Sequence, residues 1–90
     1  MTDPVYTVRF EDQAAKEVAK LDKPIRQRVL ARARTLGEDP RPPGCVQMKG
    51  YPGLWRVKAG DYRLLYTVRD GELLVLVLTV AHRRESYRDL

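Results

Sequence analysis

The sequence predicts an α+β domain of order β-α-α-β-β-β, with a mostly antiparallel four-stranded sheet and an antiparallel helix pair packed on one face. Residues 5–10 alternate between apolar and polar side chains, as a half-buried strand does. Residues 12–36 place apolar side chains at helical spacing, with an interruption near Pro24. The second half contains three strand-like segments joined by turn signals. We expect a single domain spanning residues 1–90.

The N-terminal half supplies one strand and both helices. The set expected to be buried in the strand is Tyr6, Val8 and Phe10. Asp12 is placed to cap the first helix and to complement its dipole. Pro24 suits the first turn of the second helix, and Gly37 before Asp39-Pro40 predicts its end. The apolar stripes comprise Ala14, Ala15, Val18, Ala19 and Leu21 in the first helix, and Ile25, Val29, Ala33 and Leu36 in the second.

The C-terminal half is expected to form strands over residues 54–58, 62–68 and 73–82. Asp70-Gly71 is a strong signal for a two-residue type I′ turn, and Ala59-Gly60-Asp61 is a weaker turn signal. A two-residue turn at Asp70-Gly71 places Arg63 opposite Leu78. The last strand is apolar at nearly every position, which is typical of a central strand covered on both faces.

The amino-acid composition of the chain limits the classes of function that need to be considered. Lys and Arg number 17 against 12 Asp and Glu, and this net charge of +5 favours an anionic partner such as nucleic acid, an acidic protein or a phospholipid surface. Cys45 is the single cysteine and His82 the single histidine, which excludes an internal disulfide and argues against a structural zinc site. The longest apolar run, residues 73–78, is too short to span a bilayer, and the N-terminus lacks a signal-peptide pattern. We expect a reduced cytoplasmic protein with no membrane partner, no metal and no cofactor.

Strand alternation gathers cations on one face of the predicted sheet. A two-residue turn between the second and third strands puts Arg56, Lys58 and Arg63 on one face, and the aromatic side chains on the other, where the helices pack. Like charges placed together in a sheet repel, so a bound anion is a natural explanation for the pattern. Such a pattern is more often a solvent-exposed face, and both interpretations remain open. The helix arginines Arg26, Arg28, Arg32 and Arg34 are expected to form a solvent-exposed face.

The segment after the last strand adds further cations and an aromatic ring. With a turn at Asp70-Gly71, His82 shares the face of Arg63 and Arg83 points away from it. A β-bulge, or a strand that ends near Ala81, brings Arg83 onto the same face as Arg63 instead. The sequence leaves both possibilities open.

Taken together, these segments closely resemble the RelE/ParE toxin superfamily over nearly the whole chain. The segments that carry the resemblance are Lys49-Gly50, Leu54-Trp55-Arg56-Val57-Lys58, Gly60-Asp61-Tyr62-Arg63-Leu64-Leu65-Tyr66 and His82-Arg83-Arg84-Glu85-Ser86-Tyr87. The resemblance implies a toxin of a type II toxin–antitoxin system with a cognate antitoxin. A RelE-like member acts as an endonuclease on mRNA in the ribosomal A site, whereas a ParE-like member inhibits DNA gyrase. A catalytically silent RNA-binding module is a third class to distinguish.

For a RelE-like enzyme, the resemblance implies metal-independent cleavage, in which the ribose 2′-hydroxyl attacks its own phosphate and leaves a 2′,3′-cyclic phosphate. The matching site residues are Arg56, Lys58, Arg63, Arg83 and Tyr87, with RNA contacts at Lys49, His82 and Arg84. Arg56 and Arg63 stay protonated and suit charge stabilisation. Lys58 is the candidate base, Arg83 occupies the general-acid position, and Tyr87 is placed to stack on a base. The presence of all five favours the nuclease over the gyrase inhibitor.

Overall fold

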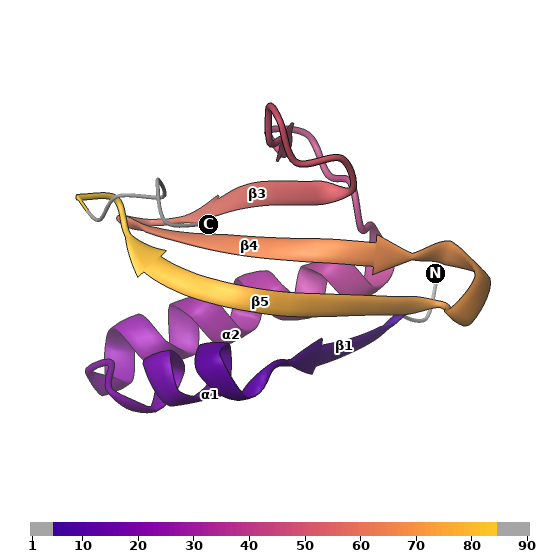
Figure 1. Ribbon diagram of the computed structural model, residues 1–90. Coiled ribbons are helices and arrows are strands. Elements are labelled where there is room, and N and C mark those ends of the chain that lie inside the picture. Colours follow the sequence, from indigo (N-terminus) through magenta and orange to yellow (C-terminus); the bar gives the residue numbers. More distant parts are fainter. Residues whose placement is uncertain (1–4, 85–90) are drawn as a thin grey trace.

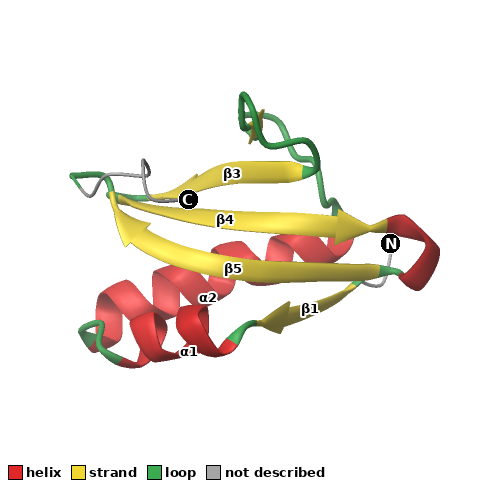
Figure 2. Ribbon diagram, viewed as in Figure 1, coloured by secondary structure: helices red, strands yellow, loops and turns green. Residues whose placement is uncertain are grey.

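The computed structural model describes residues 5–84 and confirms the α+β class. Two helices cover one face of a single sheet, and the other face of the sheet is turned away from them (Figure 1; Figure 2). In chain order the elements are β1 (Thr7–Phe10), α1 (Asp12–Ala19), α2 (Lys23–Glu38), β2 (Val46–Gln47), β3 (Leu54–Ala59), β4 (Tyr62–Arg69), a short 3₁₀ turn (Asp70–Glu72) and β5 (Leu74–His82). Neither helix in this part of the chain has the length and apolar character needed to cross a membrane.

The sheet has five strands in the order β1-β5-β4-β3-β2, one more than predicted. β1 lies parallel to β5, and every other neighbouring pair is antiparallel. The additional strand, β2, pairs Val46 with Arg56 and Gln47 with Trp55 at the edge of the sheet. A two-residue strand has no alternation to detect, and the prolines just before it predict a loop. For these reasons β2 was missed.

The core lies between the helices and the inner face of the sheet, where the predicted stripes meet. Its buried members include Ala14, Val18, Val29, Ala33, Leu36, Val57, Leu64, Tyr66, Val75 and Val77. The expected strand set, Tyr6, Val8 and Phe10, packs against this cluster and is partly buried, as predicted. The Tyr66 hydroxyl donates a hydrogen bond of 2.7 Å to the carbonyl of Pro40, and burial raises the pKa of this phenol. That bond ties the proline-rich loop to the core.

Three expectations about the helix ends are corrected. Glu11, rather than Asp12, is the N-cap of α1, and it makes no side-chain capping hydrogen bond. Asp12 is the first helical residue, where its carboxylate still complements the helix dipole. Leu21 lies beyond the end of α1 yet packs against the core. Gly37 lies inside α2, which ends at Glu38.

The β4–β5 connection differs from the predicted two-residue turn. Residues Asp70–Glu72 form a 3₁₀ turn, Leu73 follows in the left-handed region at φ 51°, and Arg69 pairs with Leu74. Further along, Tyr66 pairs with Val77 but Leu65 pairs with Thr79, so β5 contains a bulge of one additional residue. As a result, Arg63 lies opposite Ala81 and not opposite Leu78.

The bulged part of β5 extends beyond the end of β1 and takes a hydrogen-bond partner from a helix. The backbone N–H of Val80 donates to the carboxylate of Glu17 at 2.8 Å. We expect Glu17→Ala to lower the free energy of unfolding by about 1–3 kcal/mol, because a part-buried N–H loses its acceptor. Urea denaturation measures this change. Glu17→Gln retains an acceptor oxygen and serves as the matched control, and equal stability of the two variants would contradict this role for Glu17.

A polar cluster joins three segments at the other end of the sheet. The Tyr6 hydroxyl donates to Asp70 Oδ1 at 2.6 Å, and Arg41 Nη2 donates to Asp70 Oδ2 at 2.9 Å. Hydrogen bonds from Arg41 and then from Tyr6 hold the pKa of the Asp70 carboxyl below its usual value. The ionised carboxylate therefore connects the residue before β1, the proline-rich loop and the β4–β5 turn.

This cluster predicts a dependence of stability on pH. Because the pKa of Asp70 is lower in the folded chain, its contribution is complete above the unfolded value of about 3.9 and is lost as the pH falls through the folded-state pKa. Asp70→Asn should lower the Tm at pH 7, and this difference from wild type should shrink at a pH of about 2. Thermal unfolding followed by circular dichroism tests this. The same Tm difference at both pH values would show that the charge of Asp70 is not responsible.

Candidate functional site

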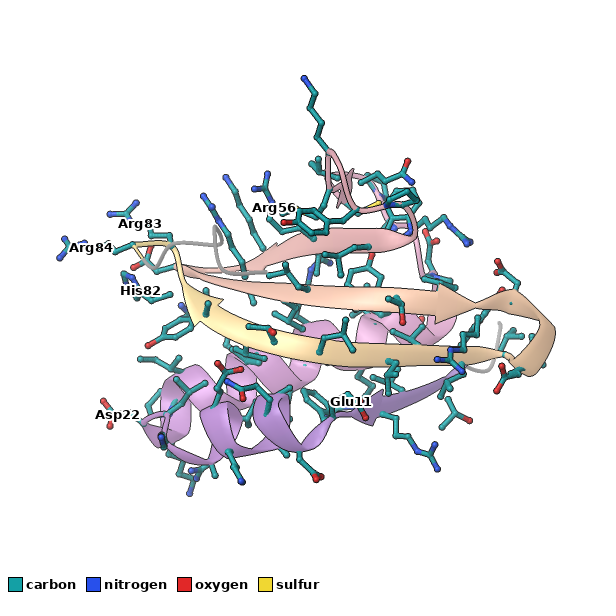
Figure 3. The ribbon with its side chains drawn as sticks, in the orientation of Figure 1. Glu11, Asp22, Arg56, His82, Arg83 and Arg84 are labelled. Carbon is teal, nitrogen blue, oxygen red and sulfur yellow. The ribbon has the colours of Figure 1, made fainter. Side chains whose placement is uncertain are left out.

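The sheet face turned away from the helices carries the predicted cations at one end. Lys58 on β3 lies directly opposite Arg63 on β4, and Arg56 lies on the same face two residues before Lys58. Figure 3 shows the Arg56 side chain on the side of the sheet away from the helices. The residues that follow the opposite alternation, including Val57 and Leu64, belong to the core beneath the helices. The predicted division of β3 and β4 into a cationic and an apolar face is therefore confirmed.

The bulge in β5 decides which residues of the C-terminal segment join this face. Because Ala81 lies opposite Arg63, His82 lies opposite Tyr62 and turns towards the helices. The rings of Tyr62 and His82 make an edge-to-face contact with centroids 5.1 Å apart. In Figure 3, His82 points to the helix side of the strand end and Arg83 to the other side. The expectation that His82 shares the face of Arg63 is wrong, and the bulge alternative for Arg83 is correct.

Arg83 is held at the β3–β4 turn. Its backbone N–H donates to the carbonyl of Asp61 at 2.7 Å, which continues the β4–β5 pairing by one step. Its Nε atom also lies 3.8 Å from the Asp61 carboxylate. Both side chains are more than half exposed, so this ion pair contributes little energy and the backbone hydrogen bond positions the residue. Asp61 thus brings Arg83 to the corner occupied by Lys58 and Arg63.

The four cations differ in how firmly they are held. Arg56 and Arg63 are partly buried, with the Nε atom of Arg63 covered, whereas Lys58 and Arg83 are exposed. The neighbour of Arg63 on β5 is Ala81, a buried residue without charge. We call Arg56, Lys58, Arg63 and Arg83 the cation corner. It presents several donors, from partly fixed and from exposed side chains, to an anion approaching the outer face.

The remaining predicted site residues are placed differently. Lys49 lies in the turn between β2 and β3, directly after Met48, whose backbone N–H donates to the Leu54 carbonyl at the start of β3. The length of β3 therefore separates Lys49 from Lys58, and the structure does not bring it into the corner. Arg84 is exposed just after Arg83, and its backbone N–H donates to Nδ1 of His82 at 3.1 Å. Tyr87 lies outside the described residues. The contribution of each to RNA binding stays a prediction.

Two arginines of α2 support the corner, although the sequence indicated only a solvent-exposed face. Arg32 Nε donates to the carbonyl of Lys58 at 3.1 Å, which fixes β3 where its cation stands. Arg28 packs over Gly60, with its Nη1 atom 3.1 Å from the position that a Cβ atom there would occupy. Gly60 also has φ +64°, a conformation that favours glycine. Helical periodicity does not predict the contacts that Arg28 and Arg32 make. The sequence likewise identifies Asp61 only as a turn residue and does not predict that its carbonyl holds Arg83.

Comparisons with known proteins identify the family and the fold of this chain. The family described as ParE toxin of type II toxin-antitoxin system, parDE, matches residues 8–87. Toxin RelG of Mycobacterium tuberculosis is 34% identical over 84 residues, which cover 92% of this chain and 97% of RelG. The mRNA interferase toxin RelE of Escherichia coli is 30% identical over 83 residues, covering 90% of this chain and 86% of RelE. The solved toxin–antitoxin complex RelBE2 of M. tuberculosis gives a TM-score of 0.78 at 33% identity, over 89% of this chain and 93% of that one.

The two-helix, five-strand architecture is thus that of a RelE-like toxin. The chain belongs to the ParE toxin family of type II toxin–antitoxin systems, within the RelE/ParE superfamily that its sequence resembles.

Proposed function

We propose that this toxin is a metal-independent endoribonuclease that cuts mRNA in the ribosomal A site and so inhibits translation. The observation that carries the proposal is the cation corner, in which Lys58 faces Arg63 and the Asp61 carbonyl holds Arg83 beside them. A relative of 30% identity bears the name mRNA interferase, and its similarity spans 90% of this chain. On a protein with a net positive charge, a cluster of cations of this kind is best suited to bind a phosphodiester of a nucleic acid.

The reaction requires three kinds of group. A base removes the proton of the 2′-hydroxyl, whose oxygen then forms a bond to its own phosphorus atom. The bond from phosphorus to the 5′ oxygen of the next nucleotide breaks, and an acid gives that oxygen a proton. The products are a 2′,3′-cyclic phosphate and a free 5′-hydroxyl. Between them lies a crowded, negatively charged phosphorane that cations stabilise.

The corner offers candidates for each role. Arg56 and Arg63, which remain protonated and are partly held by burial, stabilise the phosphorane and orient the phosphate. Lys58 supplies the amine that accepts the 2′-hydroxyl proton. We assign to Arg83 the departing 5′ oxygen, which it would stabilise and protonate, and Tyr87 would stack on a neighbouring base. Arg84 would add a backbone contact to the RNA.

A cognate antitoxin is the natural regulator of such a corner. The structural relative RelBE2 was solved as a toxin–antitoxin complex. The net charge of +5 favours an acidic or amphipathic partner segment over the outer face, where it would screen the cations from RNA. Binding of that kind would inhibit the toxin without any change in its fold.

Inhibition of DNA gyrase is the second candidate, because the matching family carries the name ParE. A gyrase inhibitor binds a protein surface and needs no group to stabilise a phosphorane. We therefore favour the nuclease. Gyrase inhibition would instead produce broken DNA with intact mRNA in cells that express the toxin.

Mapping of mRNA 5′ ends after brief induction tests the proposal directly. We expect new 5′-hydroxyl ends inside codons of translated messages, because cleavage occurs on RNA held in the A site. A translation block before induction should remove these ends, whereas a nuclease that attacks free RNA would still cut. Growth arrest without new mRNA ends would refute the proposal, and accompanying DNA breaks would identify gyrase as the target.

A further inference from the structure

A second feature lies directly behind the cation corner, on the helix side of the same sheet end. It is a cavity of about 240 Å³, lined by Ile25, Arg28, Ala59, Asp61, Tyr62 and His82. This volume is below the range of about 300–1,000 Å³ that is typical of drug-sized ligand sites, so the cavity suits a small group or one part of a larger ligand. Figure 3 shows His82 and Asp22, the residue before α2, at the same end of the molecule.

Three of the lining residues are sequence neighbours of the corner. Ala59 follows Lys58, Tyr62 precedes Arg63, and His82 precedes Arg83. Consecutive side chains of a strand point to opposite faces, so the cavity and the corner stand back to back across the end of the sheet. Only the β3–β4 turn separates them. A polynucleotide whose phosphate rests on the corner therefore needs to pass just one turn of chain to reach the cavity.

The β3–β4 turn, which lies between the cavity and the corner, contains Gly60, which has no side chain. Arg28 of α2 packs against this glycine. The Arg28 Nη1 atom lies 3.1 Å and its Cδ atom 3.3 Å from the position of a Cβ on Gly60. Arg28 is exposed and also lines the cavity. Its guanidinium can therefore contact a strand of RNA that rounds the turn, either at a phosphate or over the face of a base.

The chemistry of the lining favours a base over a phosphate. The Tyr62 and His82 rings, in edge-to-face contact at 5.1 Å, offer aromatic surface above the apolar Ile25 and Ala59. Aromatic and arginine side chains are what single-strand RNA-binding proteins use to hold an unstacked base. The Asp61 carboxylate, whose Oδ1 atom lies 3.8 Å from Arg83 Nε, repels a phosphate in the cavity, and its second oxygen can accept a hydrogen bond from an amino group. Adenine, cytosine and guanine carry an exocyclic amino group, whereas the donor of uracil is a single ring N–H between two carbonyl groups.

We propose that this cavity binds a base of the RNA strand that continues past the β3–β4 turn from the corner, with preference for a base that carries an exocyclic amino group. The assignment rests on the proposed nuclease function for its biological meaning, yet base binding can be measured without ribosome or cleavage. Tyr62 and His82 provide the stacking surface, Arg28 closes the rim at Gly60, and Asp61 accepts from the amino group.

The single histidine of the chain makes a direct test possible, because the imidazole proton signals in an NMR spectrum belong to His82 alone. Adenosine 5′-monophosphate, uridine 5′-monophosphate and inorganic phosphate are titrated separately into the full-length toxin. We expect the adenosine nucleotide to shift the His82 signals at concentrations at which inorganic phosphate does not, and the uridine nucleotide to bind more weakly. Absence of a shift with either nucleotide overturns the proposal, as does an equal shift with phosphate or equal affinity for both nucleotides.

Calorimetric titration with adenosine 5′-monophosphate then assigns the residues. Arg28→Ala and His82→Ala are expected to weaken binding by about 5- to 100-fold, the scale for loss of one stacked base. Arg34→Ala removes an exposed arginine of the same helix that lines a different cavity, and it should leave the affinity unchanged. Equal effects of Arg28→Ala and Arg34→Ala would overturn the assignment. If the wild-type toxin binds the nucleotide but cuts no mRNA, the nuclease function fails and the cavity remains a base-binding site.

Discussion

Arg63→Ala is expected to abolish the growth arrest caused by this toxin and to lower the rate of mRNA cleavage by about 10²–10³-fold, the usual cost of removing one preorganised charge-stabilising group. Arg63 occupies the middle of the corner, between Lys58 on one strand and Ala81 on the other. On the β5 side no cation can replace it, because Ala81 carries no charge, and on the β3 side Lys58 is assigned a different role, that of the base. Cleavage by ribosome-bound toxin, followed by primer extension on a defined message, measures the loss.

The fold should survive this change, since Lys58 and Arg63 are like charges directly opposite each other and gain nothing from their pairing. A native circular dichroism spectrum and retained antitoxin binding would verify this. Arg69→Ala, an exposed change at the far end of the same strand, is the matched control and should remain toxic. Full toxicity of the Arg63→Ala variant would refute the assignment of the corner as a nuclease site.

Arg83→Ala is the second change with a large expected effect, and it also should abolish growth arrest. The backbone of residue 83 stays bonded to the Asp61 carbonyl whatever its side chain, so the variant removes the guanidinium and leaves the sheet end in place. The reaction then lacks the cation beside the departing 5′ oxygen. We expect single-turnover cleavage to fall by about 10²-fold or more, with little change in Tm.

The control for Arg83 is Arg9→Ala, which removes an exposed arginine from β1 on the same outer face but three strands away from Lys58. This variant should cleave normally. If Arg83→Ala and Arg9→Ala lowered the rate equally, the effect would reflect general charge attraction to the ribosome, and Arg83 would have no role at the reacting atoms.

Much of the fold follows from local patterns. Helical spacing identified Val29, Ala33 and Leu36 as the buried face of α2, and all three are buried. Alternation placed Lys58 and Arg63 on the outer face, because every residue of a paired strand must face one side or the other. The short strand β2 could not be predicted from the sequence, because two residues at a sheet edge show no alternation of apolar and polar side chains and depend on β3 for their conformation.

By itself, the sequence determined the two layers, the identity of most strands and the cationic character of the outer face. Tertiary structure decided which C-terminal residues share that face. The bulge in β5, opposite Leu65 and Tyr66 of β4, shifts the β4–β5 pairing by one residue. A shift of one residue exchanges the faces of the sheet to which the side chains of His82 and Arg83 point. Packing of β5 against its neighbours sets that shift, including the bond from Val80 to Glu17 of α1. No pattern within β5 encodes it, because the strand is apolar along most of its length.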